Sequence, residues 1–329
     1  MNTEPLDTDT ITELVTDAVA APSLHNAQPW VFRCVRETGV VRLYADPERA
    51  LPHTDPENRG LHMGCGAALF NLRVSAAAAG LTPEVLLLPD PASPDLLAEV
   101  RLSGTGPPGD TLAGLAPSIR RRHSSRLPFR DQELPVATRE QLSEAARLEG
   151  AELFFPDAWH VRAILDLIRD AEDSEAVDPG VRAETVRWTR TEPSAVGAAA
   201  DGIPAEAFGP RQRGTSAPIR DFAVGRPMPG RDRTAFEKNP NIALLGTARD
   251  EPVDWLRAGQ ALERVLLQAT TDGLVASITS QPLEWQDIRW AVRDPVSAMA
   301  HVQMVIRIGH GPEGAASPRR PVTDVLGFL

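Results

Sequence analysis

The hydrophobic positions in the first part of the chain follow first a helical and then a strand period. Apolar side chains recur every three to four residues at Ile11, Leu14, Val15, Ala18 and Val19. This spacing predicts an amphipathic helix, which Pro22 ends. The β-prone runs 30–35 and 40–45 come next, and the turn at 37–39 predicts that they form a hairpin.

A second, longer helical pattern covers residues 59–79 and uses mainly small side chains. Its stripe consists of Leu61, Cys65, Ala68, Leu69, Leu72 and Ala76, and Gly80 ends it. Such small residues favour close packing against another helix. Strands are expected at 84–88 and 97–102, and the Gly- and Pro-rich stretch 103–110 is a candidate linker.

Part of this pattern returns 193 residues later. Gly66, Ala68, Leu69, Ala76, Gly80 and Leu81 have identical partners in Gly259, Ala261, Leu262, Ala269, Gly273 and Leu274. A dimer whose subunits fused would leave this trace, because the two helices at its two-fold interface become two helices of one chain. We therefore expect an intramolecular pseudo-dimer with halves at 1–110 and 111–329.

Residues 189–230 interrupt the second half. The segment is dominated by Ala, Gly, Pro, Ser and Arg, and its few aromatic residues include Phe208 and Phe222. Long insertions of this kind in compact proteins are either functional covers or disordered segments. We expect a lid, with disorder as the alternative.

The composition narrows the classes of partner and cofactor. A chain of 329 residues with a net charge of −11 and a pI near 5.2 repels the anionic surfaces of nucleic acids and membranes, so neither partner is expected. Neither Cys34 nor Cys65 lies in a metal-ligand pattern, so no metal site is expected. The polar N-terminus and the lack of a long apolar run predict a soluble, cytoplasmic protein.

Against this acidic background, residues 120–126 concentrate positive charge. They contain Arg120, Arg121, Arg122, His123, Ser124, Ser125 and Arg126, and Phe129 follows. Guanidinium forks and short hydroxyl donors match phosphate oxygens, so the cluster predicts a phosphate site. A solvated charged turn is the alternative.

Residues 21–30 carry the second group of candidate site residues. Ser23, His25, Asn26 and Gln28 provide hydrogen-bonding edges between two prolines, as a flat phosphorylated cofactor requires. The alternative is a tight connection from helix to strand with Trp30 in the core. A Rossmann site is not supported, because the Gly-Cys-Gly run at 64–66 follows no strand and lacks the third glycine.

Both segments resemble motifs of the FMN-dependent nitroreductase superfamily, which carries an Arg-His-Ser phosphate motif and a Pro-Ser-x-x-Asn-x-Gln-Pro-Trp loop. Residues 281–285 look like the family's Pro-Ile-Glu-Gly segment at the flavin N5 edge, and 317–321 look like its C-terminal basic pair. The loop precedes the Arg-His-Ser motif here. This order and the chain length resemble the Acg-type branch, a fused, double-length relative with a lid. The resemblance covers about 8–128 and 240–325.

The resemblance implies an α+β, nitroreductase-like fold duplicated within one chain, with one non-covalent FMN. The implied cofactor-binding residues are Ser23, His25, Asn26, Gln28, Arg122, His123, Ser124, Arg126, Pro282, Leu283, Glu284, Arg319 and Arg320. Glu284 and Trp285 are the candidates near flavin N5. Trp285 departs from the family, which has glycine there; its backbone N–H still serves, or its indole covers the ring. Arg59 and Asn71, on the small-residue helix, are further candidates for contact with the cofactor.

The implied function is an FMN-dependent oxidoreductase. It would move two electrons from NAD(P)H or an organic donor to a nitro, quinone or biosynthetic small-molecule acceptor. A flavin storage or sequestration protein with little turnover is the alternative, because a lid that closes the flavin face excludes nicotinamide. A cofactor-free scaffold is a third possibility, which the intact motifs disfavour. The chain is expected to be a monomer with an internal two-fold, or a weak homodimer.

Overall fold

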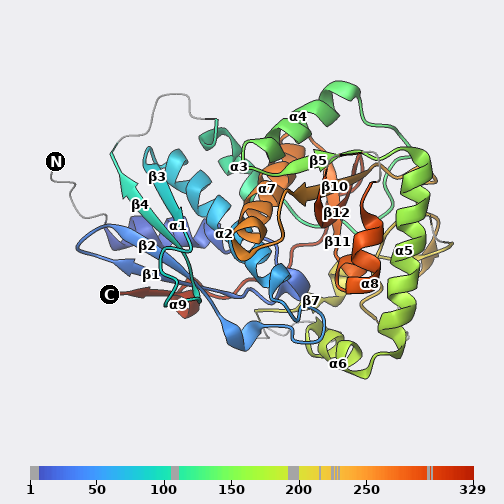
Figure 1. Ribbon diagram of the computed structural model, residues 1–329, viewed down its shortest axis with the longest axis horizontal. Helices are drawn as coiled ribbons and strands as arrows, with labels where there is room; N and C mark the ends of the chain where they lie inside the picture. Colours follow the sequence, from blue (N-terminus) through green and yellow to red (C-terminus); the bar gives the residue numbers. More distant parts are fainter. Residues whose placement is uncertain are drawn as a thin grey trace.

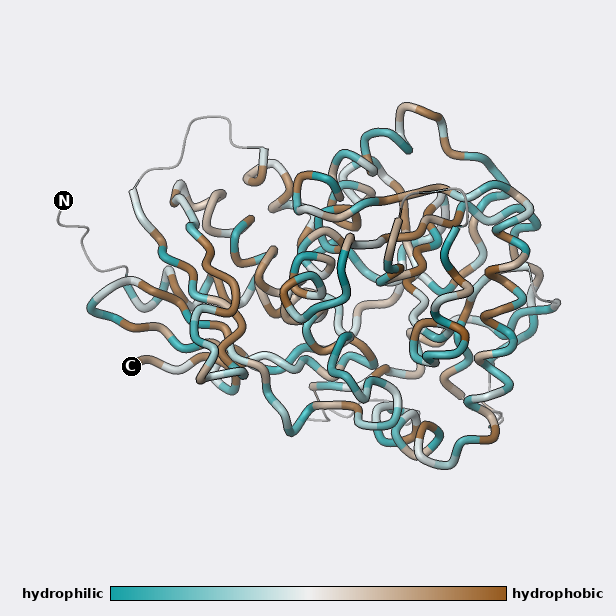
Figure 2. Tube along the Cα trace, in the orientation of Figure 1, coloured by the Kyte–Doolittle hydropathy of each residue, from teal (hydrophilic) through white to brown (hydrophobic). Residues whose placement is uncertain are grey.

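The computed structural model describes residues 7–104, 111–191 and 200–329, apart from 215, 224, 225, 227, 229, 295, 296 and 298. Two mainly antiparallel sheets flank a central pair of helices, α2 (Arg59–Ala78) and α7 (Pro252–Thr271), which pack against each other (Figure 1). Hydrophobic positions gather along the strands and the central helices (Figure 2). The expected α+β fold of two like halves is confirmed.

The first half follows the predicted elements closely. It consists of α1 (Thr8–Ala18), β1 (Trp30–Val35), β2 (Val40–Ala45), α2, β3 (Thr82–Leu87) and β4 (Leu96–Ser103). Its strands lie in the antiparallel order β1-β2-β4-β3. The hairpin expected at 30–45 therefore forms with its predicted bounds.

The second half repeats this order. It consists of α4 (Val136–Arg147), β5 (Glu152–Phe154), β10 (Ile242–Thr247), α7, β11 (Val275–Thr279) and β12 (His301–Gly309). The strand order β5-β10-β12-β11 is that of the first sheet, element for element. Helix α7 begins and ends 193 residues after α2, and β11 begins 193 residues after β3. The repeat in the sequence is thus a repeat in the structure.

Two equivalent glycines allow the central helices to touch through their backbones. A Cβ atom on Gly66 would overlap the carbonyl oxygen of Leu256 and lie 3.1 Å from the Cα of Gly259. A Cβ on Gly259 would in turn overlap the carbonyl of Met63. The small-residue stripe exists because no side chain fits at this crossing.

The halves differ most between their first two strands. Residues 36–39 join β1 to β2, whereas residues 155–241 lie between β5 and β10. This insertion contains α5 (Ala158–Val177), α6 (Pro179–Arg187), and the short strand pairs β6 (Thr189–Arg190) with β7 (Ile203–Pro204) and β8 (Arg211–Gln212) with β9 (Arg233–Thr234). The shorter helices α3 (Ala116–Ile119), α8 (Gln286–Arg289) and α9 (Val322–Val325) lie outside it.

The expected lid falls within this insertion, and its residues 192–199 lie outside the described part of the chain. We call the described residues of 200–223 the cover. The cover has its own apolar cluster of Ile203, Ala207, Phe208, Phe222 and Ala223. These side chains are buried against one another.

The C-terminal segment crosses between the halves. Strand β13 (Leu326–Phe328) pairs in parallel with the free edge of β1 in the first sheet. The division expected at residue 110 assigns this strand to the second half by sequence, whereas its hydrogen bonds join it to the first.

Candidate functional site

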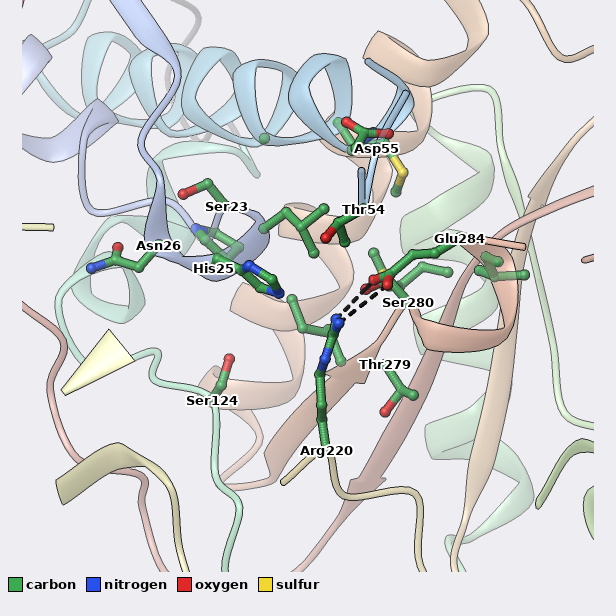
Figure 3. A pocket seen from close by; sticks show the side chains of 18 of the residues that line it. Ser23, His25, Asn26, Thr54, Asp55, Ser124, Arg220, Thr279, Ser280 and Glu284 are labelled. Carbon is green, nitrogen blue, oxygen red and sulfur yellow. Dashed lines mark hydrogen bonds and ion pairs between the residues drawn. The ribbon is translucent and has the colours of Figure 1, made fainter. Parts of the chain in front are cut away.

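A cavity lies where the loop before β1, the start of α2, the cover and the segment after β11 meet (Figure 3). It holds about 1350 Å³, counted out into its open mouth. Its lining includes Ser23, His25, Asn26, Arg122, His123, Ser124, Arg126, Leu283, Glu284 and Arg319. Residues from both halves, expected from the sequence to share a site, are thus brought together.

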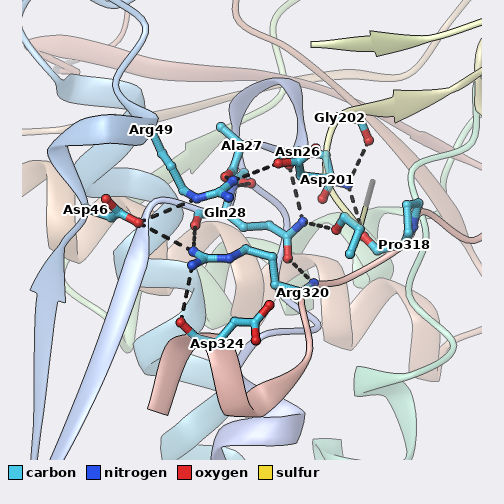
Figure 4. A network of polar contacts seen from close by, with 12 residues as sticks. Asn26, Ala27, Gln28, Asp46, Arg49, Asp201, Gly202, Pro318, Arg320 and Asp324 are labelled. Carbon is cyan, nitrogen blue, oxygen red and sulfur yellow. Dashed lines mark hydrogen bonds and ion pairs between the residues drawn. The ribbon is translucent and has the colours of Figure 1, made fainter. Parts of the chain in front are cut away.

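Four other expected site residues do not line this cavity: Gln28, Pro282, Trp285 and Arg320. Gln28 is fully buried behind the loop, where its Nε2 donates to the carbonyl of Ala200 (2.7 Å) and its Oε1 accepts from the backbone N–H of Arg320 (2.8 Å). The Arg320 guanidinium lies 3.5 Å from the Asp46 carboxylate (Figure 4). Gln28 and Arg320 thus support the loop from behind, and the cavity cation of the C-terminal basic pair is Arg319.

The loop that carries Ser23, His25 and Asn26 has an unusual backbone. His25, Asn26 and Gln28 all have positive φ, at 51°, 53° and 54°. Non-glycine residues adopt this left-handed conformation at a cost, and such strain concentrates at functional sites. The Ser23 hydroxyl helps to hold the turn by accepting the N–H of Gln28 (2.9 Å).

Asn26 fastens the loop to two distant segments. Its Nδ2 donates to the carbonyls of Gly202 (2.8 Å) and Pro318 (3.1 Å), and its Oδ1 accepts from Arg319 Nη1 (3.0 Å). Figure 4 shows these bonds to the cover and the C-terminal segment. The side chain is therefore committed to positioning Arg319 and the cover.

His25 is the residue of the loop that points at the cover. Its ring meets Phe222 edge-on, with centroids 5.7 Å apart, and neither ring nitrogen has a hydrogen-bond partner among the described residues. Burial, with the nearby cations Arg220 and Arg126, holds the pKa of His25 well below its ordinary value. The imidazole is therefore neutral, with one donor and one acceptor left for a ligand.

The arginine-rich turn is held by Ser125, which does not face the cavity. Its N–H donates to the carbonyl of Ala276 (2.8 Å), and its hydroxyl donates to that of Pro312 (2.8 Å). Ser124 forms a β-bridge to Ala276, so the turn runs beside β11. Arg122 precedes Ser124 in the sequence, and Arg126 follows it. These bonds thus fix the backbone that carries both arginines.

The buried cations at and beside this turn outnumber their carboxylate partners. Arg122 lies 3.4 Å from buried Glu263, whereas Arg126 and Arg319 form no ion pair with any described residue. Burial lowers the pKa of Arg126 to about 10 and that of Arg319 to about 9, and repulsion from Arg122 contributes to the latter. A bound anion would relieve this desolvation and repulsion, so the cluster fits a phosphate better than a solvated turn.

The opposite side of the cavity contains residues that the sequence did not single out. Arg220, from the cover, reaches Glu284 (2.8 Å) and Glu175 (2.8 Å). Asp55 accepts the N–H groups of Gly60 (2.9 Å) and Leu61 (2.8 Å) in the first turn of α2. No local motif marks either residue, because Arg220 lies in a Gly- and Pro-rich segment and Asp55 acts as a helix cap.

The two residues of α2 that were candidates for reaching a cofactor have different places. Arg59 lines the cavity, and its Nη1 donates to the carbonyl of Gln303 (2.5 Å). Burial, followed by repulsion from Arg289, lowers the pKa of Arg59 to about 10. Asn71 is buried and does not line the cavity.

Two features were sought among the described residues: a group of metal ligands and a membrane-spanning helix. Within the described ranges, no three His, Cys, Asp or Glu side chains are grouped so as to hold a metal ion. None of the described helices is long and apolar enough to cross a membrane.

Comparison with known proteins places the chain among nitroreductases. No family model matches it. The putative NAD(P)H nitroreductase Rv3131 of Mycobacterium tuberculosis is 31% identical over 338 residues, covering 99% of this chain and 93% of that protein. The putative NAD(P)H nitroreductase acg of the same organism is 31% identical over 336 residues, with 97% and 96% covered. The structure of a putative nitroreductase from Anabaena variabilis covers 94% of this chain and 90% of its own at 12% identity, with a TM-score of 0.51, a likeness of fold.

Proposed function

Because the chain belongs to the nitroreductase family, in the branch that includes acg, we propose that its cavity binds one FMN and serves NAD(P)H-dependent reduction of a small organic acceptor. A nitro compound or a quinone is the acceptor class that this proposal names. When bound, FMN supplies reversible two-electron transfer, and the protein supplies binding, orientation and charge.

The observation that carries the proposal is the meeting of the strained loop with buried arginines of which Arg126 and Arg319 form no ion pair with any described residue. Arg122, Ser124, Arg126 and Arg319 would hold the phosphate, since they gather cations and a hydroxyl at one side of the cavity. Ser23 and His25 would meet the ring system, because His25 offers unpartnered polar atoms there. One such set of residues exists in the chain, so one FMN is proposed.

A storage or sequestration protein is the second candidate, and the cover favours it. Phe222 packs on His25, and Arg126 Nη1 donates to the cover carbonyl of Ala207 (2.9 Å). Gly209 passes so close to the backbone of Arg126 that a Cβ atom there would overlap its carbonyl oxygen. A cover fastened this tightly would restrict access of nicotinamide to a flavin below it.

The absorption spectrum of the purified protein, followed by anaerobic addition of NADPH, tests the proposal and separates the candidates. Bound FMN, identified by mass spectrometry, with rapid bleaching by NADPH supports the reductase. Bound FMN that stays oxidised with NADPH but is reduced by light supports storage. Bound FAD, or no flavin after reconstitution with FMN, would contradict both.

A further inference from the structure

Arg220 separates the main cavity from a second, outer cavity. It lines both, and the outer cavity is also lined by Glu172, Glu175, Asp221 and Gln281. Figure 3 shows the Arg220 side chain rising from the cover to meet Glu284. Glu172 and Glu175 come from α5, which belongs to the insertion of the second half. The insertion thus places an acidic compartment directly behind the proposed catalytic cavity.

Two carboxylates pair with one guanidinium at this boundary, and a third carboxyl group lies beside them. Arg220 Nη1 lies 2.8 Å from Glu284 Oε1, and Nη2 lies 2.8 Å from Glu175 Oε1. Glu172 adjoins them in the outer cavity. The other ionisable groups that face this cluster are Asp173, Asp221, Arg59, Arg182 and His25. Asp221 is paired with Arg231, so it does not neutralise Arg220.

The charge balance of the cluster favours a bound proton. Glu284 accepts hydrogen bonds from both terminal nitrogens of Arg220 and from the Ser280 hydroxyl (2.7 Å), so the single guanidinium is already committed to Glu284 and Glu175. With Glu172 beside them, three ionised carboxylates would leave uncompensated negative charge in a buried place, which favours one proton in the cluster.

Gln281 donates from Nε2 to Glu175 (3.0 Å), but its buried Oε1 lacks a donor among the described residues. A protonated Glu172, which lines the same outer cavity as Gln281, would supply that donor. Burial raises the pKa of Glu284 and of Glu172 to about 7.

We propose that Glu284 donates a proton to the acceptor in the main cavity and that Glu175 and Glu172 return a proton to it from the outer cavity. The acceptor takes two electrons and one proton as hydride from the reduced cofactor. Its oxygen then takes a second proton from Glu284, whose O–H bond breaks and whose carboxylate pairs with Arg220. Water in the outer cavity reprotonates the cluster. The inference rests on the proposed function for its acceptor and its electrons.

The test uses the flavin-loaded protein, reduced by light so that it does not depend on NAD(P)H. Its reoxidation by a water-soluble benzoquinone is followed from pH 6 to pH 9, in H₂O and in D₂O. The variants are Glu284→Gln and Glu172→Gln, and the control is Asp170→Asn, an exposed carboxylate on α5. Infrared spectra of all four proteins, with and without flavin, report protonated carboxyl groups directly.

The wild type and the control should slow by about tenfold per pH unit above neutrality, with a solvent isotope effect, as expected for a required acid. Glu284→Gln should be about 10²-fold slower at pH 6 and should lose both dependences. Glu172→Gln should keep the first turnover and slow the next ones several-fold. A wild-type pH profile in Glu284→Gln would overturn the proposal.

The infrared spectra test the inference about the proton independently of the proposed function. A protonated carboxyl band near pH 6 that disappears in Glu284→Gln or Glu172→Gln supports the cluster. Its absence from the wild type overturns it. Failure to bind flavin, or reduction by light but never by NADPH, would count against the proposed function while this band still decides the proton inference.

Discussion

The two halves share one fold but have different tasks in the site. Both have the same strand order, and each has its own central helix. The two helices meet at the equivalent glycines Gly66 and Gly259. The first half keeps a short hairpin at 36–39, whereas the second carries the insertion 155–241 at the equivalent position. The scaffold tolerates this insertion because a hairpin loop lies at the surface, outside the packed core.

The insertion supplies those parts of the two cavities that do not come from the repeated scaffold. It supplies the cover, with Arg220 and Phe222, and it supplies α5 with Glu175. The strained loop comes from the first half and the arginine-rich turn from the second, so the residues proposed to hold the cofactor form one set in the chain. Duplication therefore gave the shared frame, and divergence between the halves made a single site.

The largest expected effect comes from breaking the equivalence at the helix crossing. Gly66→Ala and Gly259→Ala should each destabilise the protein by about 3 kcal/mol, because the added Cβ must displace a backbone carbonyl. Chemical denaturation measures the loss. Gly114→Ala is the matched control, since nothing lies within 4 Å of its Cβ position. Unequal costs at the two glycines would show that the two-fold is not exact in its packing.

A second comparison sets Arg126, which lines the cavity, against Arg320, which lies behind the loop. Arg126→Ala should weaken FMN binding by about 1.5–3 kcal/mol, the scale of a charged hydrogen bond. Arg320→Ala should weaken it less, because Arg320 lies behind the loop and pairs with Asp46. Fluorescence titration of apoprotein with FMN gives both values. Equal losses of affinity for the two variants would indicate that Arg320 also binds the phosphate.

A third test loosens the cover by a substitution in the insertion. Phe222→Ala removes the ring that packs on His25 and Phe208, so the cover should open more often. Reduction of bound flavin by dithionite should speed up by several-fold, and proteolysis within the cover should quicken. Trp159→Ala, at an exposed site on α5, is the control. Unchanged reduction in Phe222→Ala would mean that the cover does not limit access.

The smallest effect compares equivalent acidic positions at the start of the central helices. Asp250 lies 193 residues after Glu57. Burial opposes ionisation of Asp250, but hydrogen bonds from Arg289, Gln303 and Trp255 lower its pKa to about 2 from 3.8.

A depressed carboxyl pKa stabilises the fold above the ordinary value and loses that stability as pH falls towards the folded-state pKa. Asp250→Asn should thus cost about 1 kcal/mol at pH 7, after allowance for solvent screening, and the difference from wild type should shrink between pH 4 and pH 2. Glu57→Gln, at an exposed site, should leave stability unchanged. Thermal unfolding across this pH range measures both.

Sequence periodicity predicted the repeated scaffold well. The expected strands at 30–35 and 40–45 have those bounds in the structure, and the helix expected at 59–79 is α2. Strand β1 alternates buried and partly buried positions, whereas α2 is buried on almost all sides and stands out by its long run of small and apolar residues. The insertion was harder to predict, because its cover is held by hydrogen bonds from distant side chains such as Asn26 and Gln28.

The candidate site was predictable only where local motifs exist. Arg122, Arg126 and Ser23 stand in motifs and do line the cavity, whereas Arg220 acquires its place through Glu284 and Glu175, far away in the sequence. Motif position alone also could not distinguish Arg319 from Arg320. Adjacent residues in an extended segment point to opposite sides, and tertiary packing decides which side faces the cavity.

The stoichiometry of FMN per chain tests the central claim most directly. Protein reconstituted with excess FMN and freed of unbound flavin is analysed by absorbance, amino-acid analysis and native mass spectrometry. One FMN per chain is the predicted result, since the loop and the arginine-rich turn form one shared site between the two halves. Two FMN per chain, or none, would contradict it.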